Sequence, residues 1–141
     1  MENLWPEDLL SDFKKIKTPV SILKEQGALL GEKTKNIITG IVARTRFLGD
    51  EEDKFSSIFM IRSDALKYSY NLFYITYEVT LYPVEICIYD VDILVELGLD
   101  DKKKSVVTKD EVEFKTFLKK VFRTKKVGSL ISAILSQSQD F

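Results

Sequence analysis

The sequence contains no histidine and only one cysteine, Cys87. Without histidine there is no Ser-His-Asp or Cys-His nucleophile, and no metal site that uses a histidine ligand. A single cysteine cannot form an intramolecular disulfide, which favours a reducing, cytoplasmic setting. Because Cys87 lies in an apolar run with no histidine to activate it, we expect an inert thiol rather than a nucleophile.

Long apolar runs and an excess of either charge are also missing. No stretch approaches ~18 uncharged apolar residues, so no transmembrane helix and no membrane partner are expected. The first eight residues lack the basic stretch and apolar run of a signal peptide. The 21 Lys and Arg residues balance 22 Asp and Glu, for a net charge of −1. Dedicated nucleic-acid-binding proteins usually carry a clear basic excess, so nucleic acid is not the expected partner.

No cofactor or nucleotide motif is found in the sequence. The stretch from Gly27 to Gly31 is preceded by no predicted strand and followed by no GK[ST], so it does not form a phosphate loop. The acidic run Asp50–Asp53 lacks the alternating ligands and the glycine of a calcium loop. We therefore expect no cofactor, no metal and no enzyme of a common type.

The 141 residues, 45% of them apolar, suffice for one domain spanning residues 1–141 that buries about two-thirds of its unfolded surface. Both ends of the chain have helical spacing of apolar residues, whereas the middle alternates as strands do. The expected helices are 6–17, 18–31, 91–97, 108–122 and 124–135, and the expected strands are 36–48, 55–62, 68–80, 84–89 and a short edge strand at 106–107. For residues 91–97 a continuation of the preceding strand is the alternative to a short helix. This segregation predicts an α+β fold: a single antiparallel sheet of about four to five strands, with helices from both termini packed on one face.

Individual residues mark several helix ends. Thr18 is expected to cap the second helix. Gly27 weakens that helix by roughly 1 kcal/mol relative to alanine. Thr108, with Glu111 three residues later, fits a capping box, and Thr124 is expected to cap the last helix.

All six tyrosines lie between positions 68 and 89, a stretch that is made up of two neighbouring expected strands and their connection. Good strand propensity on a half-buried sheet explains them most simply. Alternation favours a second interpretation: if Phe73 and Ile75 face the helices, an open sheet face presents tyrosine, arginine and glutamate, and Tyr and Arg often anchor binding surfaces. The binding residues expected on this face are Arg44, Arg46, Arg62, Tyr70, Tyr74 and Glu78. A bulge at Gly40 would move Arg44 and Arg46 to the other face.

Two acidic clusters and one basic helix remain. Asp50–Asp53 and the acids between positions 90 and 101 are typical of solvated loops, and their functional alternative is the steering of a basic protein partner. Residues 109–126 hold seven Lys and Arg and three acids. Lysine stems that cover the edges of the core explain this helix most simply. Phosphate or RNA contact is the alternative, although no aromatic residues are interleaved for base stacking.

Several stretches are similar to segments of uncharacterised small bacterial α+β proteins. They are residues 18–26, which continue to 31–35, and the runs 70–73 and 81–84. The chain length and the order of its elements resemble immunity proteins of bacterial polymorphic toxin systems. This resemblance implies a bacterial cytoplasmic protein that works by binding, and it carries over no catalytic residues.

These patterns predict a non-catalytic protein-binding module of the immunity or inhibitor type. Two alternatives stay open. The first is a small-ligand-binding protein or unusual enzyme with an Arg/Tyr/Glu-lined site on the sheet, which a deep pocket at Arg44, Arg62, Tyr74 and Glu78 would favour. The second is a nucleic-acid-associated protein that uses the basic helix at 115–126, for which binding would depend strongly on salt.

Overall fold

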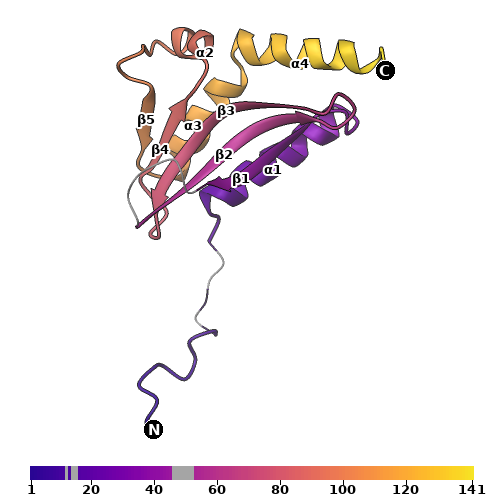
Figure 1. The fold of residues 1–141 in the computed structure, drawn as a ribbon. Coiled ribbons are helices and arrows are strands. Elements are labelled where there is room, and N and C mark those ends of the chain that lie inside the picture. Colours follow the sequence, from indigo (N-terminus) through magenta and orange to yellow (C-terminus); the bar gives the residue numbers. More distant parts are fainter. Residues whose placement is uncertain (12, 14–15, 46–52) are drawn as a thin grey trace.

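The computed structural model describes residues 1–11, 13, 16–45 and 53–141. The elements in chain order are α1 (Pro19–Lys33), β1 (Thr39–Thr45), β2 (Lys54–Ser63), β3 (Tyr68–Glu78), β4 (Val84–Ile88), α2 (Val91–Glu96), β5 (Ser105–Thr108), α3 (Glu111–Phe122) and α4 (Lys125–Ser138). Figure 1 shows their arrangement. The five strands form one antiparallel sheet in the order β1-β2-β3-β4-β5, so each strand pairs with the next along the chain. The predicted α+β fold is confirmed.

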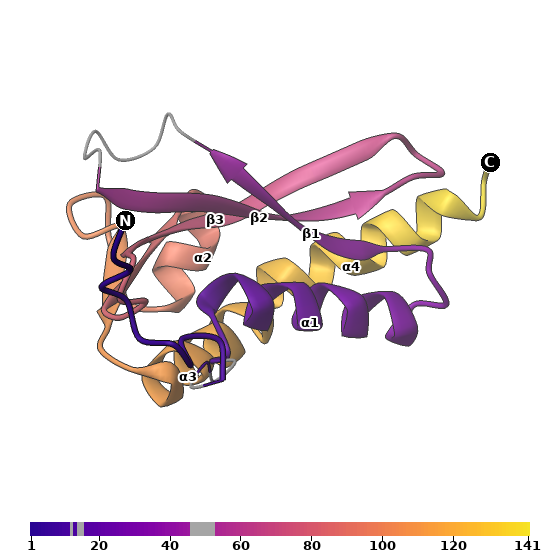
Figure 2. The same ribbon diagram turned by 90° about the horizontal axis from the view of Figure 1, so that it is seen from below.

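The long helices lie against one face of the sheet. In Figure 2, α1 and α3 lie below the strands, and α4 continues from α3 on the same side. No helix of the described chain lies on the opposite side, which we call the open face. The sheet therefore has one face committed to the core and one face free for contacts.

The backbones of α1 and β1 approach each other closely at two glycines. Thr18 caps α1, because its Oγ1 accepts a hydrogen bond from the Ser21 amide at 3.1 Å. Two turns later, a Cβ atom on Gly27 would overlap the carbonyl group of Gly40 in β1. Only glycine at position 27 permits this close backbone contact. The contact explains why a residue that weakens the helix is found there.

A bulge in β3 changes which side chains reach the core. Phe59 pairs with Phe73, whereas Met60 pairs with Asn71, so Leu72 is an extra residue in β3. Leu72 and Phe73 are consequently both buried although they are adjacent. Residues of β3 before the bulge lie on the face opposite to the one that strict alternation predicts.

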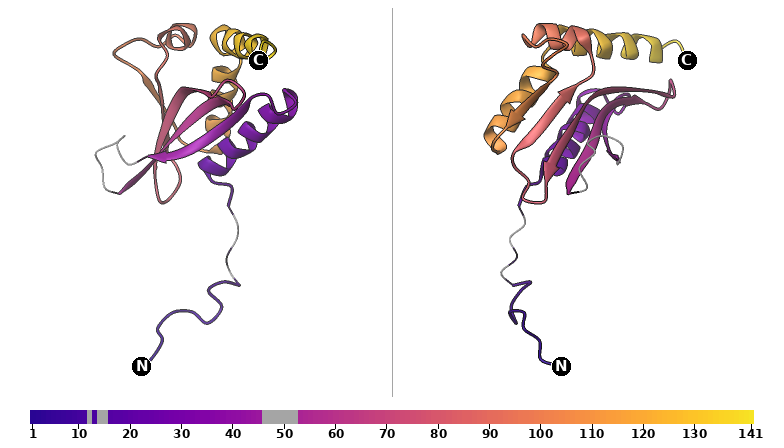
Figure 3. Two further views of the ribbon diagram at one scale, coloured as in Figure 1. Left: turned by 45° about the vertical axis from the view of Figure 1, so that its right-hand side comes forward. Right: turned by 60° about the vertical axis from the view of Figure 1, so that its left-hand side comes forward.

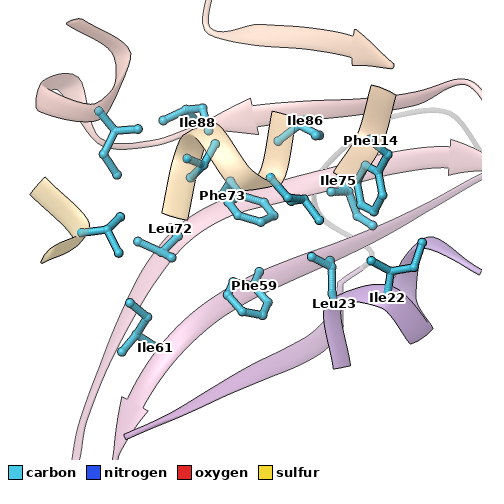
Figure 4. Packing of buried hydrophobic residues seen from close by; sticks show 14 of the residues in the cluster. Ile22, Leu23, Phe59, Ile61, Leu72, Phe73, Ile75, Ile86, Ile88 and Phe114 are labelled. Atoms are coloured by element: carbon cyan, nitrogen blue, oxygen red, sulfur yellow. The ribbon is translucent and has the colours of Figure 1, made fainter. Parts of the chain in front are cut away.

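The core fills the space between the sheet and the helices (Figure 4). The Phe59 and Phe73 rings stack with centroids 5.4 Å apart. Phe122 of α3 lies against both rings, at 5.5 and 6.3 Å. Each such aromatic pair contributes about 0.5–1.5 kcal/mol beyond its buried area. Contacts between rings therefore fix where α3 lies on the sheet.

The helix predicted at 6–17 is wrong for the residues of that segment that the structure describes. Residues 7–11 form turns, and every described side chain from 1 to 17 is exposed. A helix of this length is marginal in water by itself. Its amphipathic pattern is not sufficient to form a helix, because the described apolar side chains are exposed and bury no surface in this arrangement. The predicted end of the first strand, at residues 46–48, lies outside the described residues.

The capping box predicted at Thr108 and Glu111 is also wrong. Asp110 caps α3 instead, since its Oδ1 accepts from the Glu113 amide at 2.8 Å, and Glu113 in turn accepts from the Lys109 amide at 3.3 Å. Thr108 belongs to β5, where its hydroxyl donates to a carbonyl oxygen of β4 at 2.9 Å. The helix expected at 91–97, the edge strand at 106–107 and the cap of the last helix are confirmed.

Candidate functional site

Three of the six predicted binding residues lie on the open face: Arg62, Tyr74 and Glu78. The Tyr74 ring is 5.4 Å from the ring of Tyr89, which extends the aromatic surface onto β4. Glu78 pairs with Lys54 at the start of β2, whereas Arg62 lies near the end of that strand. Eight residues of extended strand separate Lys54 from Arg62, which is roughly 26 Å. The three residues share a face but do not form one compact constellation.

Arg44 lies on the helix-covered face, contrary to its predicted place. Strand β1 alternates in the opposite sense to the one assumed, because Val42 pairs with the buried Phe59. Arg44 shares the face of Val42, pairs with Ser57, and holds its guanidinium carbon 5.0 Å from the centre of the Phe55 ring. The register of β1 on β2 contains no bulge at Gly40, so the inversion comes from the strand as a whole.

Tyr70 is also on the helix-covered side, because it precedes the bulge at Leu72. Its hydroxyl donates a hydrogen bond to Asp90 Oδ2. The predicted site residue Arg46 lies outside the described residues. The face predicted for six residues therefore carries three of them, and two others serve contacts on the core side.

Asp90 joins β3, α2 and α4 through one carboxylate. Its Oδ1 accepts from the amides of Asp92 and Ile93, which caps α2, and Lys126 Nζ lies 3.7 Å from its Oδ2. Burial raises the pKa of Tyr70 to about 12, and the hydrogen bond to Asp90 acts in the same direction. Burial by itself would raise the pKa of Asp90, but the bonds from Tyr70 and the helix amides, together with Lys126, hold it below its ordinary value. Neither group titrates near neutral pH, so the cluster is a structural link rather than an acid–base pair.

A concave site lies between α1 on one side and α3 and α4 on the other. Its volume is about 530 Å³, inside the range of roughly 300–1,000 Å³ that is typical of ligand sites. The buried side chains of Phe59, Ile61 and Leu72 form its floor. Its apolar walls are formed by Ile22, Leu29 and Leu30 of α1, Leu118 and Phe122 of α3, and Val127 and Ile131 of α4. We call this site the helix cleft.

Cationic side chains dominate the polar part of the helix cleft. They are Lys33, Lys115, Lys119 and Arg123, joined by the amide of Gln26. No carboxylate lines the cleft in the part of the chain that the structure describes. Lys115 Nζ lies 3.5 Å from Glu111 Oε2, whereas Lys33, Lys119 and Arg123 have no ion-pair partner among the described residues. Like charges beside an apolar floor favour an anionic ligand.

Sequence reasoning recognised only one wall of this cleft. It identified the basic helix but interpreted Lys115, Lys119 and Arg123 most simply as a solvated helix face. It did not include Lys33 or Leu29 among the expected binding residues, although Leu29 lines the cleft and is 44% exposed. A usable signal was present, because α1 and α3 each carry lysine at the margin of an apolar stripe.

Arg44 lines a separate, smaller hollow of about 430 Å³ beside the first turns of α1. Arg62, Tyr74 and Glu78 take no part in it. The Arg/Tyr/Glu-lined pocket that would mark a small-ligand site on the sheet is therefore not formed by these residues together.

Metal binding and membrane insertion each need features that can be looked for in the described part of the chain. Among those residues, no three His, Cys, Asp or Glu side chains are grouped as metal ligands would be. No described helix combines the length and apolar character needed to span a bilayer. No family model, curated protein or solved structure matches this chain. The resemblance to immunity proteins and the protein-binding function therefore remain predictions.

Proposed function

We propose that the protein is a non-catalytic protein-binding module, that the helix cleft is its recognition site, and that its partner presents an acidic amphipathic helix. The observation that carries the proposal is the combination, in one concave site, of an apolar floor with four cations, three of which lack an ion-pair partner among the described residues. Helix-in-groove recognition uses an apolar groove for the anchors and rim charges for orientation and encounter rate. A module of this kind acts by holding a segment of another protein, as an immunity-type inhibitor would.

The dimensions of the helix cleft suit about three turns of a helix. On α1 the lining runs from Ile22 to Lys33, a rise of roughly 16 Å. A bound helix of that length presents apolar anchors at positions i, i+3 or i+4, and i+7 along one face. Acidic residues on its flanks would then face Lys33 on one wall and Lys119 and Arg123 on the other.

This proposal reverses the partner charge that the acidic clusters predict. Within the second cluster, Asp92 Oδ2 accepts from Lys126 Nζ at 3.1 Å. Glu96 accepts from the backbone amides of Lys125 and Lys126 at 2.7 and 3.0 Å, and so stabilises the first turn of α4. Asp92 and Glu96 thus stabilise contacts within the fold, whereas Lys33, Lys119 and Arg123 of the cleft form no ion pair with the described residues.

The test is a titration with a labelled helical peptide that carries leucine on one face and glutamate on both flanks, followed by fluorescence anisotropy. A second peptide with lysine in place of each glutamate serves as the control ligand. We expect the Glu-flanked peptide to bind, with an affinity that falls as salt rises, and the Lys-flanked peptide not to bind.

Matched charge reversals locate the binding site. The double variant K119E/R123E should bind the Glu-flanked peptide about tenfold more weakly, which corresponds to about 1.4 kcal/mol. The control K103E/K120E makes the same change in net charge at exposed positions outside the cleft and should bind as the wild type does. Equal affinities for the two double variants, or preference for the Lys-flanked peptide, would contradict the proposal.

A further inference from the structure

The described residues of the N-terminal segment, Pro6–Ile16, have exposed side chains. Large apolar side chains are exposed along the first seventeen residues, including Leu10 at 86% and Phe13 at 70%. Figures 1 and 3 show the described residues 1–11 lying away from the body of the protein. Large apolar side chains that are exposed close together are typical of a site that binds another apolar surface.

The N-terminal segment has the sequence of an acidic amphipathic helix. Leu9, Leu10, Phe13 and Ile16 share one helical face, and Pro6 suits the first helical position. Its charges are ordered along the chain: the acids Glu2, Glu7, Asp8 and Asp12 precede the lysines Lys14, Lys15 and Lys17. The chain therefore carries, at its own N-terminus, the kind of ligand for which the helix cleft is suited.

The contact between Lys17 and α1 shows where the segment can reach. Lys17 Nζ lies 3.1 Å from Glu25 Oε2. Glu25 lies on α1 between Ile22 and Leu29, both of which line the helix cleft. The chain that enters α1 is thus already held beside the mouth of the cleft. The connection Lys17–Thr18 is long enough to join two antiparallel helices.

The length of Pro6–Ile16 and the order of its charges also match the helix cleft. As a helix, Pro6–Ile16 has a rise of roughly 15 Å, one residue shorter than the cleft wall from Ile22 to Lys33. Antiparallel docking places the acidic start of the segment toward Lys33 and its basic end beside Glu25. Both ends would then face charge of the opposite sign.

We propose that Pro6–Ile16 folds as a helix into the helix cleft of its own chain and competes there with the partner helix. The inference rests on the proposed function of the cleft and adds its regulation. The structure shows the undocked arrangement, and burial of the exposed apolar side chains favours the docked one. If the segment is docked nine-tenths of the time, the apparent affinity for the partner falls about tenfold. Because K119E/R123E would also release the segment, the tenfold loss expected for this variant relative to K103E/K120E is measured with L10S and F13S, which prevent docking, added to both variants.

Trp5, the only tryptophan of the chain, reports on docking directly. It immediately precedes Pro6, the first residue of the docked helix. In the full chain we expect its fluorescence to be shielded from acrylamide. Both L10S/F13S and K119E/R123E should remove the shielding, whereas V95S, at an exposed position on α2, and K103E/K120E should not.

The Glu-flanked peptide, made without tryptophan, separates this inference from the proposed function. If docking occurs, L10S/F13S binds the peptide about tenfold more tightly than the wild type, and saturating peptide exposes Trp5 in the wild type. An exposed Trp5 with equal affinity in both proteins overturns docking and leaves the proposed function intact. Shielding that K119E/R123E abolishes, without peptide binding by L10S/F13S, sustains docking and overturns the proposed partner. Shielding that is lost on dilution means that a second copy supplies the segment, which overturns docking within one chain.

Discussion

The close approach of α1 to β1 predicts that Gly27→Ala destabilises the protein, although helix propensity predicts the opposite sign. In an exposed helix interior this substitution gains about 1 kcal/mol. Here the new Cβ overlaps the Gly40 carbonyl group, which is backbone and cannot rotate away as a side chain would. Forcing extra atoms into a packed contact typically costs 1–3 kcal/mol, and a backbone obstacle belongs at the upper end of that range. We therefore expect a net loss of about 1–2 kcal/mol.

Urea unfolding followed by far-UV circular dichroism measures this loss. With a slope of about 1–3 kcal/mol per molar urea, a loss of 1 kcal/mol lowers the midpoint by roughly 0.3–1 M. Gly128→Ala on α4 is the matched control, because a Cβ atom at that position has nothing within 4 Å, and it should raise stability by about 0.8–1 kcal/mol. A Gly27→Ala protein as stable as the wild type, or more stable, would refute the reasoning and with it the position of α1 as one wall of the helix cleft.

Three further predictions concern buried polar groups. Asp90→Asn should lower the stability of the protein at neutral pH, and this loss of stability should shrink in acid. A carboxylate with a lowered pKa stabilises the fold above its ordinary pKa of about 3.9 and loses that effect as the pH falls through the folded-state pKa. Thermal melts of both proteins along the acid range measure the difference. Tyr70→Phe removes a hydrogen bond to a charged acceptor and should cost about 1.5–3 kcal/mol in urea unfolding. Since the pKa of Tyr70 is raised to about 12, this contribution is complete below about pH 10 and disappears as the pH rises toward 12. Tyr82→Phe removes a buried hydroxyl that has no hydrogen-bond partner among the described residues, and should raise stability by about 1 kcal/mol; a lower urea midpoint would contradict this.

The sequence was sufficient to predict the fold because its signals are local. Thr18 and Thr124 act as caps through bonds to amides three residues away, so their role can be read from neighbouring residues alone. The alternating runs between positions 36 and 89 likewise define strands whose short connections favour antiparallel pairing. The helix predicted at 6–17 has an equally clear local pattern, but a helix also needs a surface on which to bury its apolar side, and no local signal reports one.

The candidate site was harder to predict because it depends on register and on distant contacts. One inverted alternation moved Arg44, and one extra residue at Leu72 moved Tyr70, to the face opposite the expected one. The helix cleft brings Lys33 beside a helix that begins almost eighty residues later, at Glu111. Which cations share a rim is decided by how α1 and α3 pack on the sheet, and that information is spread over the whole core.

Amide chemical-shift mapping by NMR, with the Glu-flanked peptide added to the full-length protein, distinguishes the helix cleft from the open face as the binding site. We predict that the largest shift changes fall on α1 between Ile22 and Lys33 and on α3 between Lys115 and Arg123. Changes concentrated around Arg62, Tyr74 and Tyr89 would place recognition on the open face instead. That result, or the absence of any change at saturating peptide, would contradict the assignment of the helix cleft as the recognition site.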